Sequence, residues 1–382
     1  MESREDGADA LVVGGGIIGL ASAWRAAEAG LRVTVVDPAP GTGASHVAAG
    51  MLAPVTEVAY GEQDLLRLTI ASARRWPGFA ADVERASGQQ IGYRPHGTLL
   101  VGFDADDARA LDELHAFQTE LGLPVERLRG REAREREALL SPRVRAGLHA
   151  GEDHQVEPER VVAALLTALE QAGGRVRRGR VARLDHDGRR VRGVTLADGA
   201  SLRSDRVVLA AGAWSGQLEG VPASARPPVR PVKGQVLHLR SPETDDPVLG
   251  ATVRGLVQGR SIYLVPRGDG RLVVGATQEE RGFDTAVTAG ATRQLLDDAV
   301  RVVPGVDELE LTGTRVGLRP ATPDNRPLLG PGELDGLVLA TGHHRNGVLL
   351  TPVSAEAVSA WLLGREADPV VAVARPGRGR TA

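Results

Sequence analysis

The segment from residue 9 to residue 37, DALVVGGGIIGLASAWRAAEAGLRVTVVD, constrains the fold more than any other part of the chain. An apolar stretch runs into three consecutive glycines, an apolar-faced helical pattern follows, and Gly30 ends that pattern before a β-branched run. This order predicts a β-strand, a tight turn, an α-helix and a second, parallel strand. We therefore expect an α/β fold that contains a Rossmann-type domain.

The glycines of this segment have the Gly-x-Gly-x-x-Gly spacing of a dinucleotide-binding turn. Gly14 permits the tight turn, Gly16 lets the backbone approach a pyrophosphate, and Gly19 lets the helix pack closely on the strand. Asp37 ends the second strand about 20 residues later, where an acidic group accepts a ribose hydroxyl. The alternative is an ordinary glycine turn after an apolar strand. The strand, the helix and the acidic residue stand around the glycines in the expected order, which favours a dinucleotide site over an ordinary turn.

The composition excludes several classes of function. The chain has no cysteine, which excludes disulfides, thiolate nucleophiles, Cys-ligated metals and a flavin attached through sulfur. We expect no metal site. A net charge of −3 indicates no basic surface for nucleic acid or an anionic membrane. No apolar run reaches the roughly 18–20 residues of a membrane span, and MESREDGADA is unlike the positive start of a signal peptide. We expect a cytoplasmic protein.

A length of 382 residues favours two domains. Strand patterns such as GQVLHL, SIYLVPR and RLVVGAT predict an antiparallel or mixed sheet, whereas residues 336–364 read as strand, turn and helix that return to the first domain. We expect a discontinuous dinucleotide-binding domain and an inserted α+β substrate-binding domain. The expected ranges are 1–90, 151–228 and 325–382 for the first, and 91–150 and 229–324 for the second.

The order of the later motifs separates FAD from NAD. A nicotinamide dehydrogenase normally continues through further βαβ units, whereas here the strand-to-glycine signatures VVLAAGAWS and LVLATGHHRNG come much later. Together with SHVAAGM, IYLVPR, RLVVGAT and GLRPATPDNRPLLG, they resemble, over nearly the whole chain, the FAD-dependent amine oxidases of the D-amino-acid oxidase family. Within that family the order of motifs resembles the glycine oxidases of thiamine biosynthesis.

The resemblance implies a fold, a cofactor and a reaction. The first domain would be a Rossmann-type FAD-binding domain, with FAD held non-covalently. The reaction would be oxidative deamination of glycine or a similarly small amine to an imine or 2-oxo acid. Oxygen would accept the electrons, and ammonia and hydrogen peroxide would be released. The resemblance also implies a homo-oligomer, a homotetramer in glycine oxidases.

The resemblance also implies individual cofactor contacts. Ile17 and Ile18 would lie over the FAD phosphates, and the backbone of Val181 would recognise adenine. A helix beginning at residues 346–348 would point its positive end at the flavin pyrimidine edge, where a reduced flavin gathers negative charge. The implied cofactor-binding residues are Gly14, Gly16, Ile17, Ile18, Gly19, Asp37, Pro38, Ala44, Ser45, Ala49, Gly50, Met51, Val181, Gly212, His343, His344, Arg345, Asn346, Gly347, Val348 and Leu349.

Arg319, in TRVGLRPATPDNRPLLG (314–330), matches a substrate-binding position of the family, as do Arg345 and Tyr263. A guanidinium fork matches a planar carboxylate with two parallel hydrogen bonds. The alternative for Arg319 is a structural ion pair with Asp324. For Tyr263 the alternative is packing within a strand.

The sequence leaves the identity of the substrate and the surroundings of the flavin open. His344 and Gln278 stand where several relatives have aromatic or apolar residues, so a substrate other than glycine is an alternative. Oxidases or dehydrogenases of sarcosine, D-amino acids or proline fit the same motifs; a tRNA-modifying or a non-catalytic flavoprotein fits less well. His46 lies beside the flavin loop, where some relatives link the flavin to histidine, but its register is shifted by one residue. Lys233 is expected at the surface or in a structural role.

Overall fold

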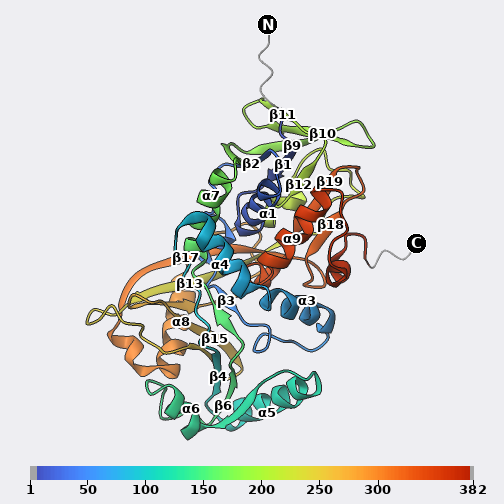
Figure 1. Ribbon diagram of the computed structural model, residues 1–382. Coiled ribbons are helices and arrows are strands. Elements are labelled where there is room, and N and C mark those ends of the chain that lie inside the picture. The colour runs from blue at the N-terminus through green and yellow to red at the C-terminus, as the bar shows by residue number, and fades with distance from the viewer. Residues whose placement is uncertain (1–6, 379–382) are drawn as a thin grey trace.

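The computed structural model describes residues 7–378 (Figure 1). The outer ends of the first and last predicted segments, 1–6 and 379–382, lie outside the described residues. The predicted strand–turn–helix–strand unit is present: β1 (Ala10–Val13) pairs in parallel with β2 (Val33–Asp37), and α1 (Ile17–Glu28) connects them. On the other side of β1 lies β12 (Val207–Leu209), also parallel. A strand from the middle of the chain therefore lies directly beside the first strand.

We call this sheet the parallel sheet. Within residues 7–378 its strand order is β18-β19-β12-β1-β2-β8, with β8 (Arg175–Arg178), β18 (Leu328–Pro331) and β19 (Leu337–Thr341). α1 covers one face together with α7 (Pro158–Gln171) and α9 (Thr351–Leu362), and the predicted apolar side of α1 is buried there. The other face packs against a small sheet of β9 (Val181–His186), β10 (Val191–Leu196) and β11 (Ser201–Arg203).

The second large sheet, which we call the mixed sheet, lies beside the parallel sheet in Figure 1. Its order is β17-β13-β16-β15-β14-β4-β6-β5, antiparallel except for the β14–β4 pair. The strands are β4 (Thr98–Gly102), β5 (Glu126–Arg129), β6 (Ala146–Ala150), β13 (Arg230–Arg240), β14 (Thr252–Val257), β15 (Arg260–Pro266), β16 (Arg271–Gly275) and β17 (Glu310–Ala321).

Helices close the mixed sheet on both faces. The buried side chains of α8 (Ala289–Val302) join the apolar core beneath β14, β15 and β16, while α5 (Ala105–Glu120) packs beside β4 and β6. Asp104 caps α5 by accepting hydrogen bonds from the amides of Asp106 and Asp107. The remaining elements are α3 (Gln63–Ala73), α4 (Trp76–Ser87), α6 (Gly130–Arg136), η1 (Gly212–Gln217), η2 (Pro304–Glu308) and η4 (Pro369–Ala374).

The α/β architecture with a second, mixed sheet confirms the predicted fold class. Two local predictions were wrong. The segment 41–54, GTGASHVAAGMLAP, consists of small residues without periodicity and so predicts a loop, but it contains the short helix α2 (Ala44–Val47) and the strand β3 (Met51–Leu52), which pairs with β7 (His154–Gln155). The helix expected to begin at 346–348 begins at Thr351. A 3-10 turn, η3 (His344–Asn346), precedes it.

Across the described residues, no helix combines the length and the apolar character that crossing a membrane requires.

Gly19 and Gly78 provide a matched test of the packing in α1. A Cβ at Gly19 would lie 2.0 Å from the carbonyl oxygen of Gly14, whereas a Cβ at Gly78 in α4 would meet nothing within 4 Å. We expect Gly19→Ala to lower the free energy of unfolding by about 1–3 kcal/mol, because α1 must move away from β1. Gly78→Ala should raise it by about 0.5–1 kcal/mol. Urea unfolding of both variants checks this, and equal effects would contradict the packing described.

Candidate functional site

The glycine turn between β1 and α1 is formed by sequence-specific contacts. Gly14 has φ +111°, and a Cβ there would lie 2.4 Å from the carbonyl oxygen of Ala210 on the neighbouring strand segment. Gly16, the N-cap of α1, is different, because the nearest atom to its Cβ position is Ser45 Oγ at 3.4 Å. The Ser45 hydroxyl accepts a hydrogen bond from the Ile17 amide (3.0 Å). The helix N-terminus and the space beside Gly16 fit a pyrophosphate.

Asp37 holds the turn in place from the end of β2. One carboxylate oxygen accepts the Gly15 amide and the other accepts the Ala39 amide, each at 2.7 Å. A carboxylate oxygen has a second lone pair, so these contacts leave capacity for a ribose hydroxyl. The Gly179 amide donates to the Asp37 carbonyl oxygen (3.1 Å), which brings Val181 close to the same strand end. The structure thus brings the predicted ribose and adenine positions together.

Two chain segments that follow strands of the parallel sheet are joined beside this turn. Thr341, at the end of β19, donates its hydroxyl to the Gly212 carbonyl oxygen (3.1 Å) and lies 2.8 Å from the Ser215 hydroxyl in η1. A threonine and a serine so far apart in the chain form no local pattern, so the sequence gives no signal for this pair.

The segment from His343 to Leu349 is held mainly by buried groups. His343 Nε2 lies 3.0 Å from the Ser354 hydroxyl, and the Leu349 carbonyl oxygen accepts from Ser72 and from the Trp76 indole. A Cβ at Gly347 would meet only the His343 Cβ, at 3.7 Å, so this side of the turn is open to a ligand. η3 and a turn precede α9. This turn, and not the N-terminus of a regular helix, therefore lies at the position predicted to face the flavin.

The predicted flavin segment 44–51 packs on the mixed sheet. Val47 and Ala49 join a buried apolar cluster with Val236, Val265 and Val273, and Met51 packs against it. Gly50 has φ +88°, and a Cβ there would lie 2.1 Å from the Val156 carbonyl oxygen. These contacts give the site an apolar wall that suits an aromatic ring system.

Arg319 lies on β17 opposite Val232 of β13, with its guanidinium over Gly234. A Cβ at Gly234 would lie 2.4 Å from Arg319 Nη1, so only glycine leaves this space free. Nη1 donates to the Thr277 carbonyl oxygen (3.1 Å). No carboxylate of residues 7–378 forms an ion pair with Arg319, and Asp324, the alternative partner, pairs with Arg326 and Arg378. Within the part of the chain that the structure describes, the charge of Arg319 therefore lacks a counter-ion.

Tyr263 lies beside Arg319 at the same face of the mixed sheet. A Cβ at Gly275 on the neighbouring strand would lie 2.5 Å from the Tyr263 hydroxyl oxygen, so this glycine also clears space. Burial raises the pKa of Tyr263, and the positive charge of Arg319 opposes that rise. The structure brings these two predicted substrate-binding residues together.

Arg345, the third predicted substrate-binding residue, is compensated within the chain. It forms an ion pair with Glu62 and donates to the Glu57 carbonyl oxygen (3.5 Å). Arg254 similarly lies 3.7 Å from the Glu57 carboxylate and donates to the Thr56 carbonyl oxygen. The segment 53–62 has no motif, so the sequence gives no signal for these acids. Of the two predicted substrate-binding arginines, Arg319 is the one whose guanidinium has hydrogen-bonding capacity left for an external carboxylate.

Asp153 fixes the segment that carries these acids. Its buried carboxylate accepts the Val55 amide (3.0 Å), the Thr56 amide (2.9 Å) and the Thr56 hydroxyl (2.6 Å). Burial raises the pKa of Asp153 to about 6, although these hydrogen bonds and Arg254 oppose the rise. The segment at one side of the site thus depends on a buried carboxylate.

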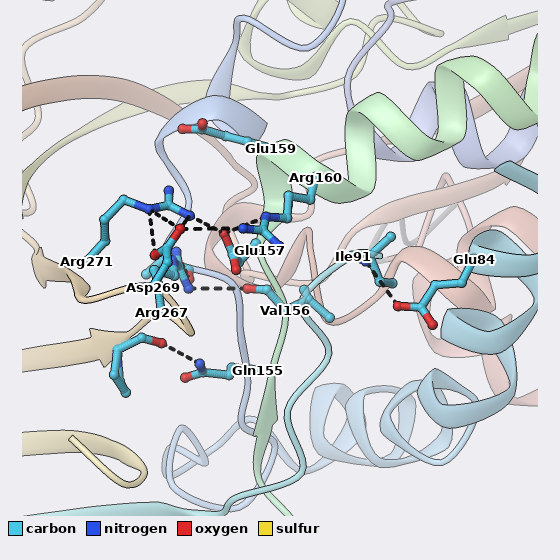
Figure 2. Close-up of polar contacts among 12 residues, drawn as sticks. Glu84, Ile91, Gln155, Val156, Glu157, Glu159, Arg160, Arg267, Asp269 and Arg271 are labelled. Atoms are coloured by element: carbon cyan, nitrogen blue, oxygen red, sulfur yellow. Dashed lines mark hydrogen bonds and ion pairs between the residues drawn. The ribbon is translucent and has the colours of Figure 1, made fainter. Parts of the chain in front are cut away.

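A partly buried ionic cluster joins the mixed sheet to the start of α7 and to the backbone around residues 49 and 156, next to the apolar wall (Figure 2). Arg267, at 5% exposure, donates to the Ala49 carbonyl oxygen (2.8 Å) and to the Val156 carbonyl oxygen (3.4 Å). Glu157, just before α7, pairs with Arg271 of β16 (2.8 Å) and with Arg160 (3.1 Å). The cluster ties the start of α7 to the β15–β16 hairpin.

The remaining histidine and lysine predictions have definite positions. His344 has φ +49°, and desolvation together with Arg345, Arg319 and Arg230 lowers its pKa to about 4. His46 is partly exposed, and its Nδ1 lies 3.6 Å from Glu159. Gln278 is exposed.

The surface alternative for Lys233 was wrong, because its side chain is fully buried and forms an ion pair with Asp284 (2.6 Å).

His343 makes the stability of the protein depend on pH. Burial lowers the pKa of His343 to about 3, from an ordinary value near 6.5. Below pH 6.5 the unfolded chain takes up a proton that the folded chain excludes, so the free energy of unfolding should fall as pH falls toward 3. Between pH 7 and pH 5 this group accounts for about 2 kcal/mol.

We expect His343→Gln to remove that part of the pH dependence, measured by urea unfolding at pH 7 and pH 5. His96→Gln, on an exposed histidine, is the control and should behave as the parent chain does. If His343→Gln kept the full difference between the two pH values, the buried neutral imidazole would not be its source.

Comparison with known proteins identifies the family. The family model described as DAO, FAD dependent oxidoreductase, matches residues 9–361. The chain is 34% identical over 374 residues to the bifunctional protein ThiO/ThiG of Synechocystis sp., covering 97% of this chain and 54% of that protein. It is 33% identical over 352 residues to the glycine oxidase of Geobacillus kaustophilus, covering 91% of this chain and 90% of that protein.

The crystal structure of glycine oxidase from Geobacillus kaustophilus has the same fold, with a TM-score of 0.88 at 31% identity over 97% of this chain and 98% of that one. The chain spans about half the length of the bifunctional relatives it matches. The family resemblance and the FAD cofactor drawn from the sequence are confirmed. The chain belongs to the DAO family of FAD dependent oxidoreductases.

Proposed function

We propose that the protein oxidatively deaminates glycine or a similarly small amine that carries a carboxylate. The observation that supports this best is the half-buried Arg319 guanidinium, which has no carboxylate partner among the described residues and lies next to Tyr263. A guanidinium in such a position binds a planar carboxylate with two parallel hydrogen bonds. The relatives named glycine oxidase support the same substrate class.

The residues around the glycine turn fit FAD. Gly16 leaves room at the N-terminus of α1 for a pyrophosphate, Asp37 keeps lone pairs for a ribose, and the apolar wall suits the ring system. We assign these residues, with the segments 44–51 and 343–349, to the cofactor. When bound, FAD supplies the acceptor for two electrons, and the chain does not have to carry out that chemistry itself.

The chain's own residues then orient the substrate. Arg319 would hold the carboxylate end, and the Tyr263 hydroxyl would add a donor at the same end. Glu62 and Glu57 compensate Arg345 and Arg254, so Arg319 is the positive charge that disfavours a protonated amine beside it. This favours the neutral form of the substrate amine, which is the form that can be oxidised. Positioning of this kind supplies about 7–11 kcal/mol of the barrier reduction in well-oriented systems.

Arg345 would act differently from Arg319. Its ion pair with Glu62 links the N-cap of α3 to η3 at one side of the site. We propose that Arg345 shapes this side of the site and makes no permanent contact with the substrate carboxylate.

Several parts of the assignment extend this proposal. We propose the domain ranges given from the sequence, oxygen as electron acceptor, release of ammonia and hydrogen peroxide, a cytoplasmic location, and a role in supplying thiamine biosynthesis.

Exposed Gln278 and half-buried His344 keep sarcosine, D-amino acids and proline as alternative substrates. Anaerobic mixing of the FAD-loaded protein with each amine, followed by flavin absorbance, distinguishes them.

Arg319→Met should lower kcat/KM for glycine by roughly 100-fold or more, because the carboxylate loses a bidentate charged partner. Arg319→Lys should recover part of that loss, since an ammonium keeps the charge but not the fork. Arg293→Met, on an exposed side chain of α8, is the control. Peroxide production and anaerobic flavin reduction measure the effect. Unchanged kinetics in Arg319→Met would remove the proposed role.

Asp37→Ala should weaken FAD binding by about tenfold or more, because the variant loses both the ribose contact and the bond that holds the Gly15 amide. Fluorescence titration of the deflavinated protein with FAD measures the dissociation constant. Asp198→Ala, on an exposed turn, should bind FAD as the parent does. Equal affinity of the Asp37 and Asp198 variants would contradict the assignment.

A further inference from the structure

Lys233 is the only lysine of the chain, and its side chain is 0% exposed. Its ammonium lies 2.6 Å from the Asp284 carboxylate and 3.9 Å from that of Glu279. An ammonium in a protein interior is costly unless it is paired, so this residue needs an explanation beyond packing. Lys233 has no part in the mechanism proposed above.

Both acids belong to the segment 276–288, which connects β16 to α8, and this segment is bound along β13. Lys233 and Glu279 exchange backbone hydrogen bonds, each 2.9 Å. The Gln235 side chain donates to the Glu279 carboxylate (2.6 Å) and accepts the Thr288 amide (2.9 Å). Two neighbouring inward side chains of β13 thus fix the whole segment.

The same segment supports Arg319. The Thr277 hydroxyl accepts the Gln235 amide (3.0 Å), and the Thr277 carbonyl oxygen accepts Arg319 Nη1 (3.1 Å). Side chains alternate along a strand, so Lys233 and Gln235 lie on the opposite face from Gly234, which is beneath the Arg319 guanidinium. One face of β13 therefore presents Lys233 and Gln235, which hold the segment 276–288, and the other face lies beneath the Arg319 guanidinium. Thr277 contacts both Gln235 and Arg319.

We propose that Lys233 is a positioning residue for carboxylate binding, acting through its ion pair with Asp284 on the segment that carries Thr277. The inference rests on the proposed function of Arg319. The Thr277 carbonyl oxygen takes one N–H of the guanidinium and so sets the direction of the others. Without the ammonium, the segment loses one of its two side-chain anchors, the Thr277 carbonyl oxygen moves, and the fork no longer faces the carboxylate squarely. Binding weakens, while a substrate that does bind reacts as before.

Kinetics and ligand binding of the FAD-loaded Lys233→Met variant test this inference. We expect KM for glycine to rise about tenfold with kcat changed less than about twofold, since the effect is on orientation of one contact. The dissociation constant of acetate, a carboxylate without an amine, should rise by the same factor in flavin absorbance titrations. Lys233→Arg should restore part of both values. A role limited to stability would move the melting temperature and neither constant.

Asp284→Asn provides an independent variant on the 40% exposed side of the pair, and it should produce the same rise. The double variant should be no worse than either single one, because both remove the same interaction. Arg281→Met, which removes an exposed partner of Glu279 (3.4 Å), should leave both constants unchanged.

Parent values of KM and of the acetate constant in both Lys233→Met and Asp284→Asn would overturn the inference. If Lys233→Met does not fold or retain FAD, unchanged constants in Asp284→Asn alone overturn it. A parent enzyme that binds neither glycine nor acetate would overturn the proposed function itself, and the inference with it.

Discussion

The buried guanidinium of Arg267 is the contact on which the arrangement of the two sheets depends. It reaches from the end of β15 to the carbonyl oxygens of Ala49 and Val156, which belong to segments of the parallel-sheet side. Burial lowers the pKa of Arg267 to about 10, and nearby Glu157 offsets part of that effect. A cation so placed needs hydrogen-bond acceptors, so the β15–β16 hairpin cannot shift against these two segments without leaving buried N–H groups of Arg267 unpaired. The apolar wall of the site follows from this fixed contact.

Charge compensation explains how the site differs from the rest of the chain. The chain is rich in arginine, and nearly every buried or half-buried guanidinium described above has an acid or several carbonyl oxygens as partners. Arg319 has one carbonyl oxygen, and two glycines keep the space around it and Tyr263 clear. Among the described arginines around the site, acids thus compensate Arg345 and Arg254 and leave Arg319 available, which is an arrangement typical of a ligand site.

The features that could be predicted from sequence are those with a local cause. The glycine spacing after β1 is one, because the close contacts of Gly14 and Gly19 require it within a few residues. The start of α9 was missed although a local signal existed: Pro352 lies in the first turn of α9, as proline commonly does.

Other features have no local signal. Lysine is normally exposed, and the partner of Lys233 lies 51 residues further along the chain, so its burial could not be predicted. The ion pair of Arg345 with Glu62 joins residues 283 positions apart. Such pairs are set by the tertiary packing of distant segments, and only a structure or an alignment reveals them.

The strand order of the parallel sheet has a consequence for how this chain folds during synthesis. β1 is flanked by β12, and β12 in turn by β19, so the centre of the sheet is complete only when residue 341 has left the ribosome. Pairing of such distant strands is slow because long loops must close first. Until β12 has emerged, the edge of β1 opposite β2 stays uncovered, and this apolar edge makes the nascent chain prone to aggregation.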